Sequence, residues 1–273
     1  MAKLAPTASG PSGAPKTKSK NMKRRTNFAS ACLVLALALT ASVYAEEPLK
    51  VLLVTGEKHH DYENQKAILS KGVSERIPSE WTIWHHKTAE AAKQAMSVEG
   101  WADAFDVVVY NICHAVEKDK AFVDALCKTH HAGKPAVAIH CTMHSYHFTI
   151  AGKEGEKEWN RLLGAYSRRH GAHKPITVKK TVVDHPATKE MPAEWATTQG
   201  ELYVLKKLYD TTTVLAYGDA GYKEGQQPVI WLNRYGAGRI FCTTLGHHNS
   251  TMERPEYLDM ISKGIKWAAG KDK

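Results

Sequence analysis

The 273-residue sequence lacks the short motifs of several large enzyme classes. It has no Walker A loop, and no GxGxxG follows the first predicted strand, so neither a P-loop nucleotide site nor a dinucleotide site is expected. It also has no GxSxG elbow of a serine hydrolase and no HExxH zinc motif. No internal repeat is visible, which argues against a solenoid or a propeller.

Uncharged apolar runs of membrane-spanning length are missing as well. The run 28–43 is shorter than the ~20 residues that span a bilayer. It follows the basic segment Met22-Lys23-Arg24-Arg25 and ends in Val43-Tyr44-Ala45. This pattern is typical of a secretory signal peptide at 22–45, cleaved after Ala45, and predicts a periplasmic or extracellular protein without a stable membrane anchor. A single membrane anchor is the less favoured alternative, and a lipoprotein site at Cys32 is not favoured because Cys32 lies at the start of the run.

Charge of one sign is in excess only near the N-terminus. The chain has 37 Lys and Arg against 28 Asp and Glu, and the first 45 residues hold seven of the basic residues and no acidic one. Residues 46–273 therefore carry 30 basic against 28 acidic side chains, which gives no footprint for nucleic acid. Residues 1–21 show no apolar periodicity, and we expect either a disordered leader or a true start at Met22.

Cysteine is sparse in residues 46–273, which hold four. An even number in an exported chain permits disulfides. Because three of the four lie in or just after predicted apolar strands, we favour buried free thiols over disulfides. Cys141 lies at a strand-to-helix turn, where a nucleophile could sit, but a buried inert thiol is the favoured interpretation. The four positions are Cys113, Cys127, Cys141 and Cys242.

Apolar runs and helical periodicity alternate in the first half of this part of the chain. Strands are predicted at 49–55, 81–84, 106–110 and 136–139, and helices at 62–77 and 117–131. The alternation implies parallel strands with right-handed crossovers. The strands are continuous apolar runs, as expected when helices cover both faces of the sheet.

The second half has a different character. Residues 141–175 are expected to be irregular apart from a helical stretch near 156–163. Short strands are predicted at 176–183, 202–205, 213–217, 229–232 and 239–243, and a helix at 255–269. We therefore predict a single α/β domain at 46–273, with a doubly wound, mostly parallel sheet and a β-rich insertion.

The placement of histidine is the strongest functional signal, since all 15 histidines lie in residues 46–273. Ligands of open α/β sheets bind outside the carboxyl ends of the strands. We therefore expect a histidine-rich site at this edge. Four other histidines are expected to be structural or surface residues: His85, His86, His130 and His131. The histidines that follow predicted strands lie in the segments His59-His60-Asp61, Cys113-His114, His140 with His144 and His147, and Gly246-His247-His248.

Several short segments, taken in order, carry a family resemblance. They are Val51–Gly56 with His60-Asp61-Tyr62, Ala138-Ile139-His140, His173, His185-Pro186, Glu201-Leu202-Tyr203, and Gly238-Arg239-Ile240-Phe241 through Gly246-His247. Over about residues 49–269 the chain resembles the ThuA-like (trehalose utilisation) family. The resemblance implies a class I glutamine amidotransferase-like fold with a flavodoxin-like core.

The same resemblance argues against amidotransferase activity. Those enzymes carry a nucleophilic cysteine at the turn after the central strand, where His140 stands here and Cys141 comes one position later. No His-x-Glu partner follows near the C-terminus. The sequence also departs from the ThuA-like pattern at Gly200, where the family often has Asp before the position of Glu201.

The resemblance implies carbohydrate catabolism, with a disaccharide or a keto sugar as substrate. Proton abstraction beside a sugar carbonyl is chemically suitable and would serve isomerisation or elimination. Simple hydrolysis is less attractive because no well-placed carboxylate pair is visible. We expect catalytic roles for His140, His247, His60 and Glu201, and substrate contacts from Asp61, Tyr62, His173 and Tyr203.

Two alternatives stay open at this point. A divalent transition metal ion, Zn, Mn or Fe, could be held by His60, His140 and His247. His140 and His144 have i, i+4 spacing and would share a face if His140 begins a helix. The protein could instead be a non-catalytic carbohydrate-binding or accessory protein, with some of its seven Trp forming sugar-stacking surfaces.

Overall fold

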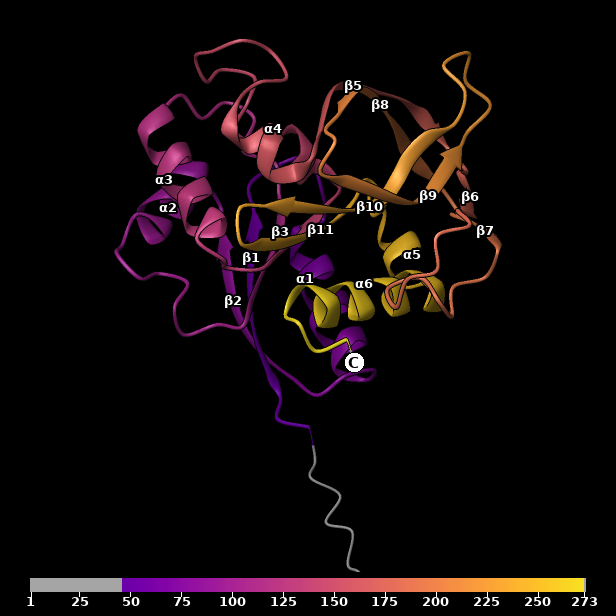
Figure 1. The fold of residues 1–273 in the computed structure, drawn as a ribbon, viewed down its shortest axis with the longest axis horizontal. Helices are drawn as coiled ribbons and strands as arrows, with labels where there is room; N and C mark the ends of the chain where they lie inside the picture. The colour runs from indigo at the N-terminus through magenta and orange to yellow at the C-terminus, as the bar shows by residue number, and fades with distance from the viewer. Residues whose placement is uncertain (1–45, 273) are drawn as a thin grey trace, which may run out of the picture. The chain divides into compact units, whose positions relative to one another are not determined.

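The computed structural model describes residues 46–272, and their centre is a sheet in the order β2-β1-β3-β4-β11-β10-β9-β6-β7 (Figure 1). The first five strands in this order are parallel to one another, in the flavodoxin order. The predicted α/β class with a doubly wound, mostly parallel sheet is confirmed. These parallel strands are β2 (Ser79–His86), β1 (Leu49–Gly56), β3 (Val107–Ile112), β4 (Ala136–Ile139) and β11 (Gly238–Thr243).

The other four strands extend the same sheet, each antiparallel to its neighbour. The turn at Gly236-Ala237-Gly238 closes the β10–β11 hairpin. The β-rich part of the sequence is therefore largely a continuation of the central sheet. The four strands are β10 (Gln227–Tyr235), β9 (Thr212–Asp219), β6 (Thr177–Lys180) and β7 (Glu194–Ala196).

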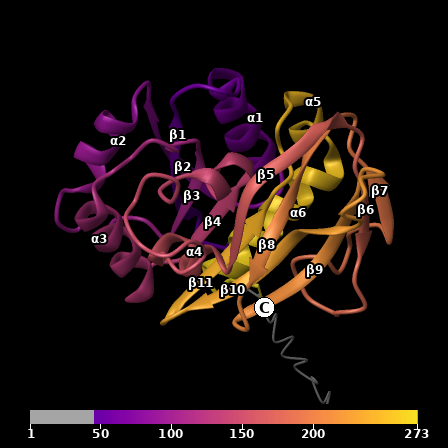
Figure 2. The same ribbon diagram turned by 90° about the horizontal axis from the view of Figure 1, so that it is seen from above.

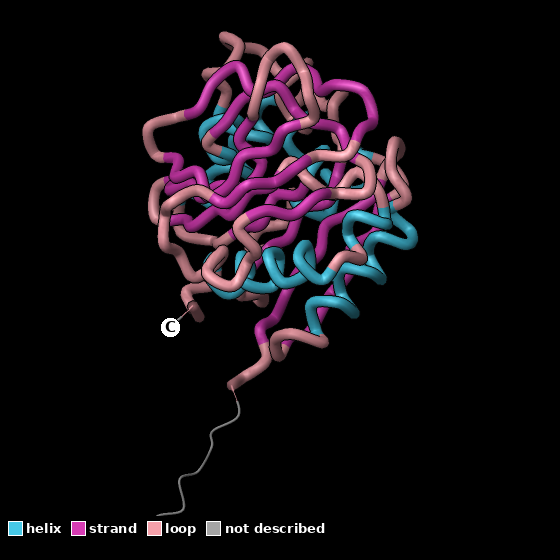
Figure 3. The backbone as a smooth tube through the Cα atoms, turned by 90° about the vertical axis from the view of Figure 1, so that its right-hand side faces the viewer, coloured by secondary structure: helices cyan, strands magenta, loops and turns pink. Residues whose placement is uncertain are grey.

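Helices cover both faces of the sheet (Figures 2 and 3). Along β1, Val51 and Leu53 face one core, whereas Leu52 and Val54 face the other, because successive side chains point to opposite faces. This is why the strand reads as a continuous apolar run. The first core holds α1 (Tyr62–Ser74), α5 (Asn249–Met252) and α6 (Pro255–Ala268), and the second holds α2 (Ala89–Met96), α3 (Lys120–His131) and α4 (Glu158–Leu163).

A separate two-stranded ribbon pairs β5 (Ala165–Lys174) with β8 (Gly200–Leu208), antiparallel (Figure 1). The expectation of irregular structure at 165–174 was wrong. The sequence AYSRRHGAHK hides the strand because most of its side chains from Arg168 onward are exposed, so it has no apolar alternation. The pairing places His173 directly opposite Glu201.

Two short helices and one short strand were not predicted. Helix α2 buries only Ala92 and Met96 on its apolar face, too few to show a period, although Thr88 caps it by accepting from the amide of Ala91. Helix α5 and strand β7 have four and three residues. Elements this short depend on their neighbours in space more than on local propensity.

The predicted signal peptide at 22–45 and residues 1–21 lie outside the described residues. Among the helices of residues 46–272, none combines the length and the apolar character needed to cross a membrane. The seven Trp are all buried or half-buried. They therefore contribute to packing, and none forms an exposed stacking surface.

His130 on α3 is structural, as expected. Its Nδ1 donates to the carbonyl of Lys134, and its Nε2 accepts from the hydroxyl of Tyr110, each over 2.8 Å. The side chain is fully buried, and burial lowers the pKa of His130 to about 4.

Acid should destabilise the protein partly through His130. Between about pH 6.5 and pH 4 the unfolded chain binds a proton at this residue and the folded chain does not, so the free energy of unfolding falls as the pH falls. Between pH 7 and pH 5 the free energy of unfolding of the His130→Gln variant should therefore fall by about 2 kcal/mol less than that of the wild type. Urea unfolding at both pH values measures this, and an unchanged pH dependence in the variant would contradict it.

Candidate functional site

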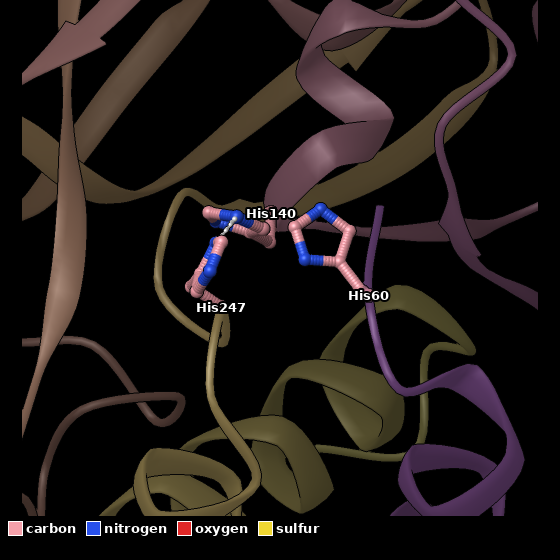
Figure 4. Close-up of side chains that lie close together, drawn as sticks. All are labelled: His60, His140 and His247. Carbon is pink, nitrogen blue, oxygen red and sulfur yellow. Dashed lines mark hydrogen bonds between the residues drawn. The ribbon is translucent and has the colours of Figure 1, made fainter. Parts of the chain in front are cut away.

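The structure brings three strand-end histidines together (Figure 4). His60 follows β1, His140 follows β4 and His247 follows β11. The ring centroid of His60 lies 4.9 Å from that of His140 and 4.7 Å from that of His247, and the latter two are 5.2 Å apart. Each ring offers a nitrogen within 4.8 Å of the others. The carboxyl ends of three parallel strands therefore meet at one cluster, as the sequence predicts.

His140 sits at a strained position with a fixed tautomer. Its φ of 46° lies in the left-handed region, at the first residue of the 3₁₀ helix η1 (His140–His144). Its Nδ1 lies 2.7 Å from the carbonyl oxygen of Thr244, which can only accept, so Nδ1 carries the proton. The Nε2 lone pair consequently faces the cluster, 3.2 Å from Nδ1 of His247. Burial lowers the pKa of His140.

The loop that carries His247 is held by a buried amide chain. The side chain of Asn111 donates to that of Gln65 over 3.0 Å, and Gln65 donates to the carbonyl of His247 over 3.1 Å. The preceding residue, Gly246, has a φ of +109°, which L side chains rarely adopt. Backbone conformation and the buried amides together fix where the imidazole of His247 lies.

Glu201 enters the cluster from β8 and joins four histidines. Its Oε2 lies 3.0 Å from Nδ1 of His247 and 3.5 Å from Nε2 of His140. Its Oε1 accepts from Nε2 of His173 over 2.8 Å and lies 3.4 Å from Nδ1 of His170. Burial raises the pKa of Glu201, but the close approach of His140, His247 and His170 outweighs it and holds the pKa well below its usual range.

His60 differs from the other members because both of its ring nitrogens are buried without a hydrogen-bond partner. Burial, and the neighbouring His140 and His247, lower the pKa of His60 to about 2, so the ring is neutral. The loop that positions it is strained, with Glu57 and His59 both at a φ of 82°. Strain and unpartnered buried nitrogens of this kind concentrate at functional sites.

Two tyrosines line the cluster with free hydroxyls. The ring of Tyr203 stacks on His144, with centroids 4.3 Å apart, and lies 5.0 Å from His140. The ring of Tyr62 meets that of His60 edge to face at 5.5 Å. Both hydroxyls are buried without a partner. His140 and His144 therefore both pack against the ring of Tyr203, and their i, i+4 spacing does not bring them together as ligands of one metal ion.

Two hollows open on this cluster, with volumes of about 720 Å³ and about 440 Å³. His59, His60 and His247 line both of them. The larger also has Asp61 and Asn249 in its wall, whereas the smaller has Glu201, Tyr203 and Phe148. A ligand that reaches the cluster therefore has room on either side of His60 and His247.

Two predicted site residues have other partners. Asp61 caps α1, since its carboxylate accepts from Asn64 and from the side chain of Asn249 over 2.7 Å, while it also lines the larger hollow. His114, which follows β3, is fully buried and bonds to the hydroxyl of Tyr146 over 2.6 Å. The expectation that all four strand-end segments deliver a histidine to one site therefore holds for three of them.

The structure pairs Cys113 with Cys141, so the expectation of four free thiols was wrong for these two. Cys113 follows β3 and Cys141 follows His140, and both line the smaller hollow. The bond joins two strand ends beside the cluster, and it removes Cys141 as a candidate nucleophile. Cys127 and Cys242 are buried and free, as expected.

Removing this disulfide should destabilise the protein substantially. The bond spans a sequence separation of 28 residues, and a loop of that size constrains the unfolded chain by about 3.5 kcal/mol. We expect Cys113→Ala with Cys141→Ala to lower the free energy of unfolding by that amount in urea. The wild type should match the variant once a reductant is added, and equal stability without reductant would contradict the pairing.

Comparison with known proteins identifies the family of this chain. The family described as ThuA, trehalose utilisation, matches residues 50–268. The chain belongs to the ThuA family. Membership implies a role in carbohydrate utilisation.

Solved structures agree with this assignment. A ThuA-like protein from Parabacteroides merdae has a TM-score of 0.64 at 18% identity, covering 82% of this chain and 90% of that one. A second, from Bacteroides uniformis, has a TM-score of 0.65 at 18% identity, covering 85% and 96%. A search of curated proteins gives no match.

The ThuA-family fold also resembles that of glutamine amidotransferases. A Thermoplasma acidophilum protein named for GMP synthase has a TM-score of 0.51 at 12% identity, covering 82% of this chain and 96% of that one. At this identity the likeness shows the fold alone. The predicted glutamine amidotransferase-like fold is thereby confirmed.

Sequence reasoning missed three residues that shape the site of this ThuA-family chain. Thr244 fixes the tautomer of His140 through its carbonyl, which no side-chain motif could reveal. Gln65 holds the His247 loop from the buried face of α1. His170, on β5, lies beside Glu201, on β8. Only the pairing of these two strands could have revealed this from the sequence.

Proposed function

We propose that this ThuA-family protein is an exported enzyme of carbohydrate utilisation that acts on a disaccharide or a keto sugar at the histidine cluster. The observation that carries the proposal is His60, whose two buried, unpartnered nitrogens lie at the boundary of two hollows beside the linked His140, His247 and Glu201. Burial keeps the free imidazole neutral, so a lone pair is available to accept a proton, and the nearby carboxylate of Glu201 favours the imidazolium that then forms.

The chemistry we propose is proton abstraction beside a sugar carbonyl. A nitrogen of His60 forms a bond to the proton, the C–H electron pair becomes the C=C bond of an enediolate, and the carbonyl π pair moves to oxygen. The hydroxyl of Tyr203, which lines the smaller hollow, lacks a partner and can donate to the sugar or to the developing oxyanion, whereas Tyr62 lines neither hollow and packs against His60. Return of the proton to the former carbonyl carbon, with a proton shift between the two enediolate oxygens, gives isomerisation. Departure of a substituent with its bonding electron pair, from the carbon on the other side of the deprotonated carbon, gives β-elimination and restores the carbonyl.

The site composition favours this chemistry over hydrolysis. Inverting and retaining glycosidases need two carboxylates that flank the bond. In the described cluster Glu201 is tied to His173 and His247, and Asp61 is tied to Asn64 and Asn249. Neither carboxylate is free to flank a glycosidic bond.

Export is part of the proposal. The basic segment, apolar run and Val43-Tyr44-Ala45 of the sequence support it, and so does the Cys113–Cys141 disulfide, because such bonds persist in oxidising compartments. N-terminal sequencing of the protein recovered from the periplasm or the medium of an expressing bacterium should give Glu46 as the first residue. A cell-associated protein that keeps Met22 would contradict export.

The test of the activity uses a keto-disaccharide and its unoxidised parent as a matched pair. Wild-type protein should convert the keto sugar, as followed by chromatography and mass spectrometry, and His60→Ala should not. His131→Ala is the matched control, because His131 is exposed and its ring packs on Tyr235 at the β10–β11 turn, at the other end of β11 from His247. Saccharide binding without turnover by the wild type would instead indicate a non-catalytic binding protein.

A further inference from the structure

Three atoms of the cluster form a small triangle. Nε2 of His140 and Nδ1 of His247 are 3.2 Å apart, Nδ1 of His247 and Oε2 of Glu201 are 3.0 Å apart, and Nε2 of His140 and Oε2 of Glu201 are 3.5 Å apart. Ligands at 2.0–2.1 Å around a tetrahedral ion are separated by about 3.3 Å. The triangle thus has the size of one face of such a coordination shell.

The three atoms of this triangle do not have enough protons to satisfy their hydrogen-bonding capacity. Nδ1 of His140 holds its proton against the carbonyl of Thr244, so Nε2 is an acceptor, and Oε2 of ionised Glu201 is an acceptor too. A single proton on Nδ1 of His247 then has to serve both, and two acceptors face each other at 3.5 Å. A cation between the three atoms would satisfy all of them at once.

We infer that His140, His247 and Glu201 bind a divalent transition metal ion. Two imidazole nitrogens with one carboxylate oxygen suit Zn²⁺, Mn²⁺ or Fe²⁺ better than Mg²⁺ or Ca²⁺, which prefer oxygen ligands alone. The ligand set differs from the three histidines expected from the sequence, because Glu201 replaces His60. The inference concerns binding and stands or falls independently of the proposed substrate.

The partners of these three residues are those that orient metal ligands. His140 donates its other ring N–H to a backbone carbonyl, which fixes the tautomer and raises ligand basicity. The second carboxylate oxygen of Glu201 accepts from His173, so Oε2 is turned toward the triangle. Gln65 holds the backbone of His247.

His60 lies outside the triangle. Its nitrogens come within 4.8 Å of those of His140 and His247 but make no hydrogen bond, whereas the triangle atoms approach to 3.0–3.5 Å. His60 is therefore a neighbour of the proposed site and not one of its ligands. A second combination, His173, His247 and His248, is also close enough for a metal, but His173 is already bonded to Glu201.

The experiment measures metal binding, not activity. The full protein, stripped with a chelator, is titrated with Co²⁺, whose visible d–d band reports nitrogen and oxygen coordination, and with Zn²⁺ against a chromophoric chelator. We expect one equivalent to bind, and Glu201→Gln to weaken binding at least about 100-fold. His60→Ala and His248→Ala should change the affinity less than about threefold.

A further variant guards against misfolding of Glu201→Gln. His173 has a half-exposed side chain, and His173→Gln should leave the fold intact yet weaken binding about 10- to 100-fold, because it orients Glu201 without touching the ion. Circular dichroism checks each variant. Binding lost in His60→Ala as completely as in Glu201→Gln would restore the three-histidine set, and no stoichiometric binding by the wild type would overturn the inference.

Discussion

Replacing His140 with alanine should lower the turnover number for a keto-disaccharide by at least ~10³-fold. The imidazole is the only cluster member joined both to the β11 end, through Thr244, and to His247 and Glu201. Its loss breaks the linked group and removes a ligand of the inferred metal ion. Steady-state kinetics on the purified variant measures the effect, and retention of more than about a tenth of the wild-type rate would contradict the assignment.

A paired variant separates catalysis from folding. His140 has a φ of 46°, where alanine is strained and glycine is not, so His140→Gly should be more stable than His140→Ala by about 1 kcal/mol. Both variants should be equally inactive. Added imidazole should restore part of the activity of His140→Gly, because the fully buried ring leaves a cavity of its own shape. If the activity instead followed the stability, so that His140→Gly kept more activity than His140→Ala, the role of His140 would be structural.

Replacing Gly246 with alanine should destabilise the protein by about 2–4 kcal/mol and weaken the site together with it. A Cβ at this position would lie 2.5 Å from the hydroxyl of Tyr257 and 3.0 Å from Cε of Met252, at a φ of +109°. The backbone has to shift, and His247 is the next residue. Thermal and urea unfolding measure the stability, and the Co²⁺ spectrum reports the position of His247.

Tyr257→Phe supplies a matched control for this substitution. The hydroxyl of Tyr257 is buried and has no hydrogen-bond partner, so its removal alone should have little effect on stability. In the double variant with Gly246→Ala the closest contact disappears, whereas the backbone strain and the 3.0 Å approach to Cε of Met252 remain. We therefore expect partial recovery. No recovery at all would mean that the conformation of Gly246, and not the contact, controls the loop.

The parallel half of the sheet could be predicted because its physics is local. Strands β1, β3 and β4 are buried apolar runs covered by helices on both faces, and each crossover helix that was predicted shows a period of its own. The convergence of His60, His140 and His247 follows from the same rule, since parallel strands end at one edge. Here a topological principle was sufficient without any motif.

The ribbon and the disulfide could not be predicted in the same way. Strand β5 is largely exposed and basic, so it has no apolar pattern, and it exists because β8 pairs with it. The Cys113–Cys141 bond joins the ends of two neighbouring strands, β3 and β4, whose order in the sheet no local pattern gives. Both depend on contacts between distant segments.

The position of Glu201 within the cluster is a feature of the site that the sequence could not predict either. The family resemblance singled it out, but its two oxygens divide their roles only through the β5–β8 register, which sets His173 opposite it. No sequence pattern separates Oε1 from Oε2, and none places His60 outside the triangle. Such fine distinctions of position arise from packing, which sequence patterns do not encode.

The most direct test of the proposed chemistry is exchange of the proton beside the sugar carbonyl. A keto-disaccharide is incubated with the purified protein in D₂O, and proton NMR follows the signal of the hydrogen on the carbon next to the carbonyl. The account predicts that this signal disappears faster with wild-type protein than with His60→Ala or with buffer alone. A signal that persists unchanged, while the wild type still binds the sugar, would contradict proton abstraction at this site.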